Sequence, residues 1–408
     1  MTGTDLPRLL TEIPGPRSRA WVDRLALREC PAISARRARQ AAVLGLADTD
    51  PIVWEEALGA NVRDVDGNLF VDLSSGFGVA TVGHRDPAVI AAAQRQSGRL
   101  LHAMGDAFPD PMRVRLLERL CELTGMERGI LGSSGSDAVE AALKTARMAT
   151  GRDAVLAFRG SYHGLSYGAL SVTDYKSQAF RAPFAGQLGQ HVRHASFGGP
   201  IPSLSEVGAV IVEPIQGRGG MREPPEGWLE ALREACSTAG SLLIYDEIYT
   251  GFGRTGHLFA FPHEARPDLL CVGKGMAGGF PISACLGTAE VMDAWGASRG
   301  EALHTQTFLG NPVGCAMALA CIDRIIELLP RVEALDLAAR LREHGPVCGR
   351  GLMLGLRVPD APALSRRLLE QGFIALPAGE GAEVLAITPP LCITEDQIAA
   401  SLSALSAA

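Results

Sequence analysis

The chain has 408 residues, of which 47% are hydrophobic and 20% charged, and its 38 basic and 45 acidic side chains give a net charge of −7. This length predicts two or three structural units with a sizeable core. The mildly acidic balance argues against a nucleic-acid binder or an anionic-membrane binder, because either would need a clustered basic surface. The short basic patch Arg36-Arg37-Ala38-Arg39 is interpreted as a solvated helix face.

The nine cysteines are scattered along the chain and show no CxxC spacing. This usage is typical of buried free thiols in a reducing compartment, and no metal site is predicted. The N-terminus has no basic segment followed by an apolar one, and every apolar stretch is interrupted well before about 18 residues. We therefore expect a soluble cytoplasmic protein without a signal peptide or a membrane span.

The predicted elements change in character along the chain. Residues 1–50 read as one or two helices beginning near Pro14-Gly15-Pro16, and residues 60–75 as a hairpin that turns at Asp66-Gly67. From about residue 110 onward, short apolar strands alternate with helices, and a long helix begins at Pro312. The strand candidates are 154–158, 209–212, 241–245 and 269–272, and the helix candidates between them include 137–148 and 225–238. This alternation predicts a parallel sheet covered on both faces.

Two charged side chains follow buried strands, where ligands collect in such sheets. Asp246 follows Ile244-Tyr245, and Lys274 follows Cys271-Val272 through Gly273. Buried charges are costly unless they are paired or functional. They could form a structural ion pair. Alternatively, Lys274 could bind an aldehyde cofactor as a Schiff base while a carboxylate keeps the ring nitrogen of that cofactor protonated.

A candidate phosphate cradle supports the cofactor alternative. Gly132-Ser-Ser-Gly-Ser136 runs directly into the helical stretch that begins at Asp137. Small residues at a helix N-terminus present free N–H groups and the positive end of the helix dipole to an anion. Taken alone, the same residues could be ordinary helix caps.

Several ordered motifs resemble those of class III (omega-type) aminotransferases, which depend on pyridoxal 5′-phosphate (PLP). The resemblance covers about residues 50–395. The motifs are Asp66-Gly-Asn, Gly83-His84, Ser134-Gly-Ser-Asp-Ala-Val-Glu, Gly160-Ser-Tyr-His-Gly164, Val212-Glu-Pro-Ile-Gln-Gly217, Asp246-Glu-Ile-Tyr-Thr-Gly-Phe-Gly-Arg-Thr-Gly256, Lys274-Gly-Met-Ala-Gly-Gly-Phe-Pro281, Thr307-Phe-Leu-Gly-Asn-Pro312 and Pro389-Pro-Leu391.

The resemblance implies an α/β fold of PLP-dependent fold type I, with a mainly parallel sheet flanked by helices and a smaller α+β domain built from the N- and C-terminal segments. The implied division is 1–60 for an N-terminal helical segment packing with the small domain, 61–310 for the large PLP-binding domain and 311–408 for the small domain.

The resemblance also implies a role for each matched residue. Lys274 would form the internal aldimine and shuttle the substrate proton, and Asp246 would salt-bridge the pyridine nitrogen. Tyr162 would stack on one face of the ring and Ile248 would press on the other. The phosphate would be held by Ser134, Gly135 and Ser136.

Four further positions match the cofactor site of the family. Thr307 would reach the phosphate of the neighbouring subunit, which implies a homodimer with shared sites. Glu213 and His163 match cofactor-site positions without a defined individual role. Tyr249 stands where many relatives have a glutamine that bonds the phenolic oxygen of the cofactor, and a tyrosine hydroxyl could also make that bond.

The sequence departs from the family at the substrate carboxylate clamps. Ala386 stands where relatives that use glutamate carry an arginine, and Leu165 stands where 4-aminobutyrate enzymes carry another. Arg218 replaces a glutamate that neutralises the first of these arginines. Neither Ala386 nor Leu165 can bind a carboxylate in a bidentate manner. Arg218 could take over carboxylate recognition, bind another anion such as a sulfonate or phosphate, or lie on the surface without a substrate role.

Leu165, Trp54, Phe77 and Val79 match substrate-facing segments of relatives and predict an apolar amine pocket. The leading functional prediction is a ping-pong aminotransferase acting between an amine or amino-acid donor and an oxo acceptor. The alternatives are an amino-acid racemase or epimerase or a phospho-amine lyase on the same fold and, from a different class, a non-catalytic PLP-binding protein.

Overall fold

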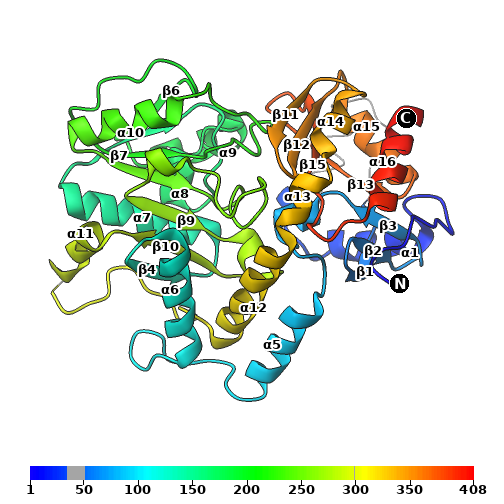
Figure 1. Cartoon of the computed structure of the whole chain (residues 1–408), viewed down its shortest axis with the longest axis horizontal. Coiled ribbons are helices and arrows are strands. Elements are labelled where there is room, and N and C mark those ends of the chain that lie inside the picture. Colours follow the sequence, from blue (N-terminus) through cyan, green and yellow to red (C-terminus); the bar gives the residue numbers. More distant parts are fainter. Residues whose placement is uncertain (35–50, 298) are drawn as a thin grey trace.

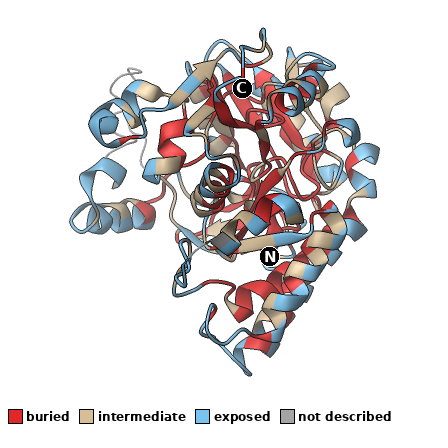
Figure 2. Ribbon diagram, turned by 90° about the vertical axis from the view of Figure 1, so that its left-hand side faces the viewer, coloured by how far each residue is buried: buried red, intermediate tan, exposed pale blue. Residues whose placement is uncertain are grey.

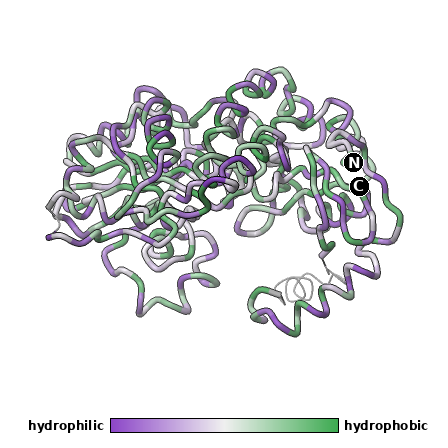
Figure 3. Tube along the Cα trace, turned by 90° about the horizontal axis from the view of Figure 1, so that it is seen from below, coloured by the Kyte–Doolittle hydropathy of each residue, from purple (hydrophilic) through white to green (hydrophobic). Residues whose placement is uncertain are grey.

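The computed structural model describes residues 1–34, 51–297 and 299–408, so the basic patch at 36–39 lies outside the described residues. Figure 1 shows a large lobe built on one sheet and a smaller lobe that holds both termini, and Figure 3 shows both termini on the side of the smaller lobe. The helix α12 (Pro312–Leu328) runs in the large lobe and leads through α13 (Pro330–Ala334) into the smaller lobe (Figure 1).

The large lobe contains a seven-stranded sheet in the order β4-β10-β9-β8-β7-β5-β6. Strand β10 is antiparallel to both of its neighbours, and the remaining pairs are parallel. The mainly parallel sheet is therefore confirmed. The strands are β4 (Arg128–Gly132), β5 (Ala154–Phe158), β6 (Val192–Ala195), β7 (Val207–Val212), β8 (Leu242–Asp246), β9 (Leu269–Val272) and β10 (Ser283–Gly287).

Helices cover both faces of this sheet, and Figure 2 shows the buried residues gathered in the interior. Ile211, Ile244 and Cys271 pack in one cluster with residues of α7 (Gly135–Thr150). Their chain neighbours, such as Val210, Leu243 and Leu270, pack on the other face with residues of α10 (Trp228–Ala239). Alternate side chains of a strand point to opposite faces, so strands buried on both faces must be apolar throughout.

The smaller lobe contains two four-stranded sheets. One has the order β1-β2-β3-β13, formed by Trp54–Leu58, Asn61–Asp64, Leu69–Asp72 and Phe373–Ile374. The other has the order β11-β12-β15-β14, formed by Val347–Arg350, Met353–Arg357, Val384–Ile387 and Leu376–Ala378. The predicted hairpin is confirmed as β2–β3, and it pairs with β13 from the C-terminal segment. The domain boundary at residue 60 that the resemblance implies would separate the paired strands β1 and β2.

The other helices connect and cover these sheets. The predicted N-terminal helix is confirmed as α1 (Pro16–Ala26), and α5 (Pro87–Ser97) packs against α12. No helix within the described ranges is long and apolar enough to cross a membrane. The remaining elements are α2 (Pro31–Ser34), α4 (Ser75–Gly78), α6 (Pro111–Thr124), α8 (Tyr167–Val172), α9 (Ser177–Phe180), α11 (Ala289–Met292), α14 (Leu337–Arg342), α15 (Ala361–Glu370), α16 (Glu395–Ala407) and the 3₁₀ turns η1 (Ala182–Gln187), η2 (His263–Ala265), η3 (Lys274–Ala277) and η4 (Asp293–Ala297).

Candidate active site

The two predicted charges lie at the carboxyl ends of neighbouring strands. Asp246 is the last residue of β8 and is buried, while Lys274 follows β9 after Gly273 and begins η3. Burial lowers the pKa of Lys274 to about 8, and the negative charges of Asp246 and Glu213 only partly oppose this shift. A lysine with a lowered pKa has a larger neutral fraction near pH 7 and is therefore a better nucleophile.

Asp246 is held by two donors. The amide N–H of Ile248 donates to its Oδ1 at 3.0 Å, and its Oδ2 lies 2.8 Å from Nδ1 of the fully buried His163. The other ring nitrogen of His163, Nε2, is buried and has no hydrogen-bond partner among the described residues. The carboxylate is thus fixed in one orientation by Ile248 and His163.

Glu213 connects two parts of the site. Its Oε2 accepts a hydrogen bond from the amide of Tyr162 at 2.9 Å, and its Oε1 accepts one from the amide of Gly217 at 3.3 Å. Burial raises the pKa of Glu213 to about 7, with the nearby His163 opposing this shift and Asp246 adding to it. One carboxylate therefore ties the backbone of the predicted stacking residue to the turn that carries Arg218.

The predicted phosphate cradle is the N-terminus of α7. The Ser134 side chain caps the helix by accepting from the amide of Asp137 at 3.2 Å. Within the described chain, the amides of Gly135 and Ser136 have no acceptor, so they remain available to an anion. The Ser136 hydroxyl accepts from the amide of Leu165, and a Cβ at Gly164 would lie only 2.0 Å from it.

Ile248 and Tyr162 line the same region. The Ile248 side chain would be 2.9 Å from a Cβ at Gly135, so glycine is required for this close approach to the cradle. The Tyr162 ring contacts Tyr175 and Phe180 edge-on, each with centroids 6.3 Å apart. Ile248 therefore lies against the cradle, and Tyr162 packs in an aromatic group with Tyr175 and Phe180.

Tyr249 occupies space that two glycines leave open. A Cβ at Gly78 or at Gly217 would lie 2.4 or 2.3 Å from its ring. The Nζ of Lys274 lies 4.0 Å from the ring centroid, and the hydroxyl of Tyr249 donates a hydrogen bond to Oγ1 of Thr388 at 3.3 Å. Burial raises the pKa of Tyr249, so its hydroxyl stays protonated and can donate. The sequence predicted the position of Tyr249 but not the need for these two glycines.

Arg218 lies above the aromatic ring that is expected to stack on the cofactor. Its Cζ is 4.5 Å from the centroid of Tyr162 and 5.5 Å from that of Tyr175. Across the described residues, its guanidinium makes no ion pair or hydrogen bond to a protein acceptor. Its charge contributes to lowering the pKa of Lys274. Arg218 is therefore a partly buried cation over Tyr162, and no protein acceptor of its guanidinium is found among the described residues.

The other predicted substrate-side residues differ in exposure. Phe77 is 65% exposed and Leu165 is 45% exposed, whereas Val79 is half-buried. Trp54 lies at the start of β1 with its ring edge-on to His84, 5.7 Å between centroids. Ala386 is buried on β15 in an apolar cluster against which Tyr249 packs.

Thr307 is exposed in the described chain. The preceding residue, Gln306, accepts a hydrogen bond from Ser133 at 2.7 Å and also contacts Asp137, which is paired with His304 at 3.0 Å. The segment that carries Thr307 is thus anchored on the cradle of its own chain while Thr307 itself faces outward.

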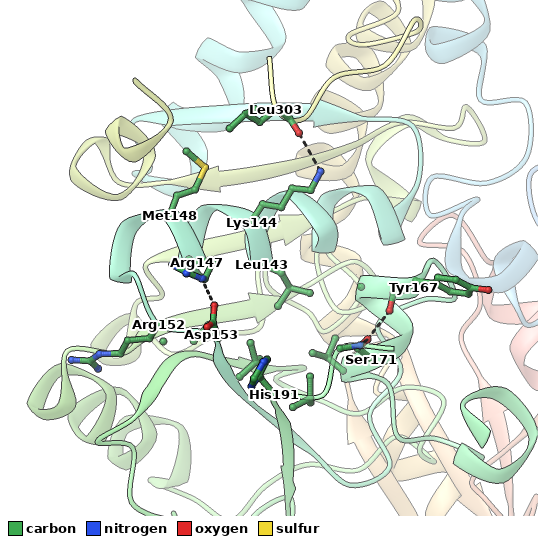
Figure 4. Close-up of a pocket in the computed structure, with 18 of the residues that line it drawn as sticks. Leu143, Lys144, Arg147, Met148, Arg152, Asp153, Tyr167, Ser171, His191 and Leu303 are labelled. Carbon is green, nitrogen blue, oxygen red and sulfur yellow. Dashed lines mark hydrogen bonds and ion pairs between the residues drawn. The ribbon is translucent and has the colours of Figure 1, made fainter. Parts of the chain in front are cut away.

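A cavity of about 600 Å³ lies apart from this site, beside the body of α7 (Figure 4). None of the predicted site residues lines it. Its basic side chains already have protein partners: Arg147 contacts Asp153, Arg152 donates to the carbonyls of Val207 and Ala239, and Lys144 donates to the carbonyl of Leu303. The cavity therefore offers no uncommitted charge for a ligand.

Sequence reasoning missed two buried charges near the site. Arg254, only 1% exposed, donates to the carbonyls of Leu352 and Pro389 and to the hydroxyl of Ser75. It therefore links the large lobe to the smaller one, and burial lowers its pKa to about 10. Asp72, at the end of β3, is fully buried. Arg254 stood inside a matched motif, but neither charge follows a strand of the large sheet.

Comparisons with known proteins agree with this geometry. The family model of class-III aminotransferases matches residues 46–408. The chain is 37% identical over 371 residues to the acetylornithine aminotransferase of Methanopyrus kandleri, covering 87% of this chain and 94% of that relative. It is 35% identical over 456 residues to a 4-aminobutyrate aminotransferase of Mycobacterium tuberculosis, covering 98% and 97%.

Solved structures show the same fold. The ornithine aminotransferase of Toxoplasma gondii superposes with a TM-score of 0.80 at 29% identity, covering 94% of this chain and 96% of that one. A PLP-bound amine transaminase from an uncultivated Pseudomonas species gives 0.79 at 29% identity, covering 87% and 94%.

The chain therefore belongs to the class-III aminotransferases. It is a PLP-dependent aminotransferase of fold type I. The residues present fit the cofactor: unpaired amides at the start of α7 suit a phosphate, Asp246 suits a cationic ring nitrogen, and the buried Lys274 suits an aldehyde.

Proposed function

We propose that this aminotransferase moves the amino group of a donor with an apolar side chain to an oxo acid whose carboxylate is bound by Arg218. The observation that carries the proposal is the uncommitted guanidinium of Arg218 stacked on Tyr162 beside Lys274. Arginine binds carboxylates with two parallel hydrogen bonds, and a stacked guanidinium is already oriented for them. The apolar Leu165 and the buried Ala386 stand where relatives place other arginines, so Arg218 has no competing clamp.

Each residue of the cofactor half has a proposed task. When bound, PLP supplies an aldehyde that takes up the amino group and a ring that withdraws electrons from the substrate. Lys274 would hold the cofactor and carry the proton of the substrate Cα, and Asp246, oriented by His163, would keep the ring nitrogen protonated. Gly135, Ser136 and the Ser134 cap would hold the phosphate.

The remaining cofactor-half residues would position the ring. Tyr162 and Ile248 would enclose its two faces, and Glu213 would fix the backbone amide of Tyr162 relative to that of Gly217. The hydroxyl of Tyr249, which donates to Thr388 in this structure, would turn to donate to the phenolic oxygen in place of the glutamine of relatives. On the substrate side, Trp54, Phe77, Val79 and Leu165 would form the apolar wall that receives the donor.

We also propose a homodimer in which Thr307 completes the phosphate site of the partner. The exposed Thr307 adjoins large apolar side chains that are 40% to 69% exposed, and such a patch marks an interaction surface. These side chains are Leu100, Leu101, Met104, Phe108 and Phe308. Sedimentation velocity tests the assembly, and a fully active monomer would contradict it.

The scattered free cysteines support a cytoplasmic location.

The two half-reactions, followed separately by cofactor absorbance, test the proposed substrate class. Arg218→Ala should raise the KM for oxo acids about 10- to 100-fold, because a charge-assisted hydrogen bond contributes about 1.5–3 kcal/mol. The KM for a donor without a carboxylate should stay the same. Arg222→Ala is the matched control, since Arg222 also stacks on an aromatic ring, Phe197. An Arg218→Ala enzyme with unchanged KM values for every oxo acid would disprove the carboxylate role.

Loss of optical rotation or release of phosphate without amine transfer would instead favour racemase or lyase chemistry.

A further inference from the structure

The segment that carries Phe77 has an unusual backbone. Four consecutive residues have positive φ angles: 47° at Ser75, 54° at Gly76, 64° at Phe77 and 79° at Gly78. Such a left-handed turn is unfavourable for residues with a Cβ, and Ser75 and Phe77 both have one. Strain of this kind persists only where the surrounding structure enforces it, and it is concentrated at functional sites.

One buried carboxylate enforces the turn. The Oδ1 of Asp72 accepts hydrogen bonds from the amide of Ser74 at 2.8 Å and from its hydroxyl at 2.6 Å. The Oδ2 accepts from the amide of Gly76 at 2.8 Å and contacts Nε2 of His84 at 2.9 Å. Asp72 is fully buried, and the four contacts occupy both of its oxygens. The carboxylate thus fixes the chain on either side of Ser75 and stabilises the left-handed path.

The turn lies against the catalytic residues. The Tyr249 ring fills the space beside Gly78, and this same ring is 4.0 Å from Nζ of Lys274. On the other side, the hydroxyl of Ser75 donates to the carbonyl of Thr388 at 2.7 Å. The backbone that follows Phe77 is therefore held against the Tyr249 ring, and Phe77 itself is 65% exposed although it is a large apolar side chain.

From these contacts we propose that Asp72 is a positioning residue for donor specificity: it holds the left-handed turn Ser75–Gly78 so that the Phe77 ring is presented to apolar amine donors. This inference rests on the proposed apolar donor wall. His84 supports Asp72 from outside the turn, and the edge of Trp54 packs on its ring. The apolar part of the amine substrate would pack on the exposed Phe77 ring.

The variant Asp72→Asn tests the role of the carboxylate. An amide replaces one oxygen by a donor, so either the Ser74 donors or the Gly76 amide would face an N–H group, and the turn would lose its support. We expect the KM for a bulky arylalkyl amine to rise about tenfold, because released backbone strain allows the ring to leave its place. The KM for the oxo acid and the absorbance of the bound cofactor should be unchanged.

A matched control separates positioning from folding. Asp64 is another fully buried carboxylate of the same sheet, and it holds the β2–β3 turn through the amides of Asp66 and Asn68. Asp64→Asn should lower thermal stability without changing the ratio of the two KM values. If Asp72→Asn and Asp64→Asn had the same kinetic effect, the positioning role would be disproved.

A double-mutant cycle gives the decisive readout. If Asp72 acts through the Phe77 ring, the tenfold effect of Asp72→Asn on the amine KM should fall to less than about twofold in a Phe77→Ala background. An effect that persists there would overturn the inference. Where Asp72→Asn fails to fold, His84→Phe takes its place, with His84→Gln as the conservative variant that keeps a donor near Asp72 and should restore the KM.

The same measurements distinguish this inference from the proposed function. If the donor wall itself is wrongly placed, Phe77→Ala alone would leave the KM of every amine unchanged. If only the inference about Asp72 is wrong, Phe77→Ala would raise the amine KM while Asp72→Asn would not. The Arg218 experiment reports on the oxo acid and is independent of both results.

Discussion

The proposed cofactor side and the proposed substrate side of the active site are built from different parts of the molecule. Asp246 and Lys274 stand at the ends of adjacent parallel-sheet strands, and the cradle begins the helix that follows β4. The substrate side combines the turn 75–78, Arg218 and the strand β15, which come from both ends and the middle of the chain. The first side is positioned by one sheet, whereas the second depends on how the two lobes meet.

This difference has an energetic counterpart. The charged groups of the cofactor side have defined partners, such as His163 on Asp246 and two amides on Glu213. On the substrate side, Arg218 is unpaired and Phe77 and Leu165 are exposed. Paired, buried groups resist change, whereas unsatisfied and exposed groups gain their partners from a ligand. Changes on the first side should therefore damage the chemistry, and changes on the second should redirect specificity.

The largest expected effect is on the cofactor side. Asp246→Asn removes the negative charge that faces the ring nitrogen, and loss of one preorganised electrostatic contact typically costs about 10²- to 10³-fold in kcat. Both half-reactions should slow by the same factor, because the same ring serves both. Stopped-flow absorbance of each half-reaction measures this. A slowing confined to one half-reaction would contradict the division between the two sides, since that pattern is expected of variants on the substrate side, such as those of Arg218 and Phe77.

A smaller effect concerns pH. Because burial lowers the pKa of Lys274 to about 8, the neutral amine should predominate above that pH. Below it, the rate at which the cofactor-free protein takes up PLP should fall about tenfold per pH unit. The uptake rate is measured from pH 6 to 10 and divided, at each pH, by the rate at which PLP reacts with a simple alkyl amine in solution. The ratio isolates the effect of the protein environment on Lys274. If the uptake rate kept rising with pH up to the pKa of an exposed lysine, Lys274 would not be desolvated.

The sequence predicted the cofactor side better than the substrate side for a physical reason. The strand before Lys274 and the helix after Ser134 can each be recognised from a short stretch of sequence. We expect them to lie close together because the carboxyl ends of the strands of a parallel sheet share one edge. The β10 strand, antiparallel to both neighbours, had no such signal.

The substrate side depends on contacts between distant segments. Pairing of β3 with β13 brings residue 71 next to residue 373, and the Ser75 hydroxyl reaches the carbonyl of Thr388. Nothing in the local pattern around Asp72 predicts four positive φ angles, because only two of those residues are glycine. The same holds for Arg254, whose partners Leu352 and Pro389 belong to the smaller lobe.

The most direct test of the account uses the small number of lysines in the chain. The sequence has three, Lys144, Lys176 and Lys274, and Lys144 is exposed while Lys176 is half-buried. Borohydride reduction of the PLP-loaded protein, followed by digestion and mass spectrometry, identifies the lysine that carries the cofactor. We expect a single label on Lys274, with the two other lysines as internal controls. A label on Lys144 or Lys176, or the absence of any label, would contradict it.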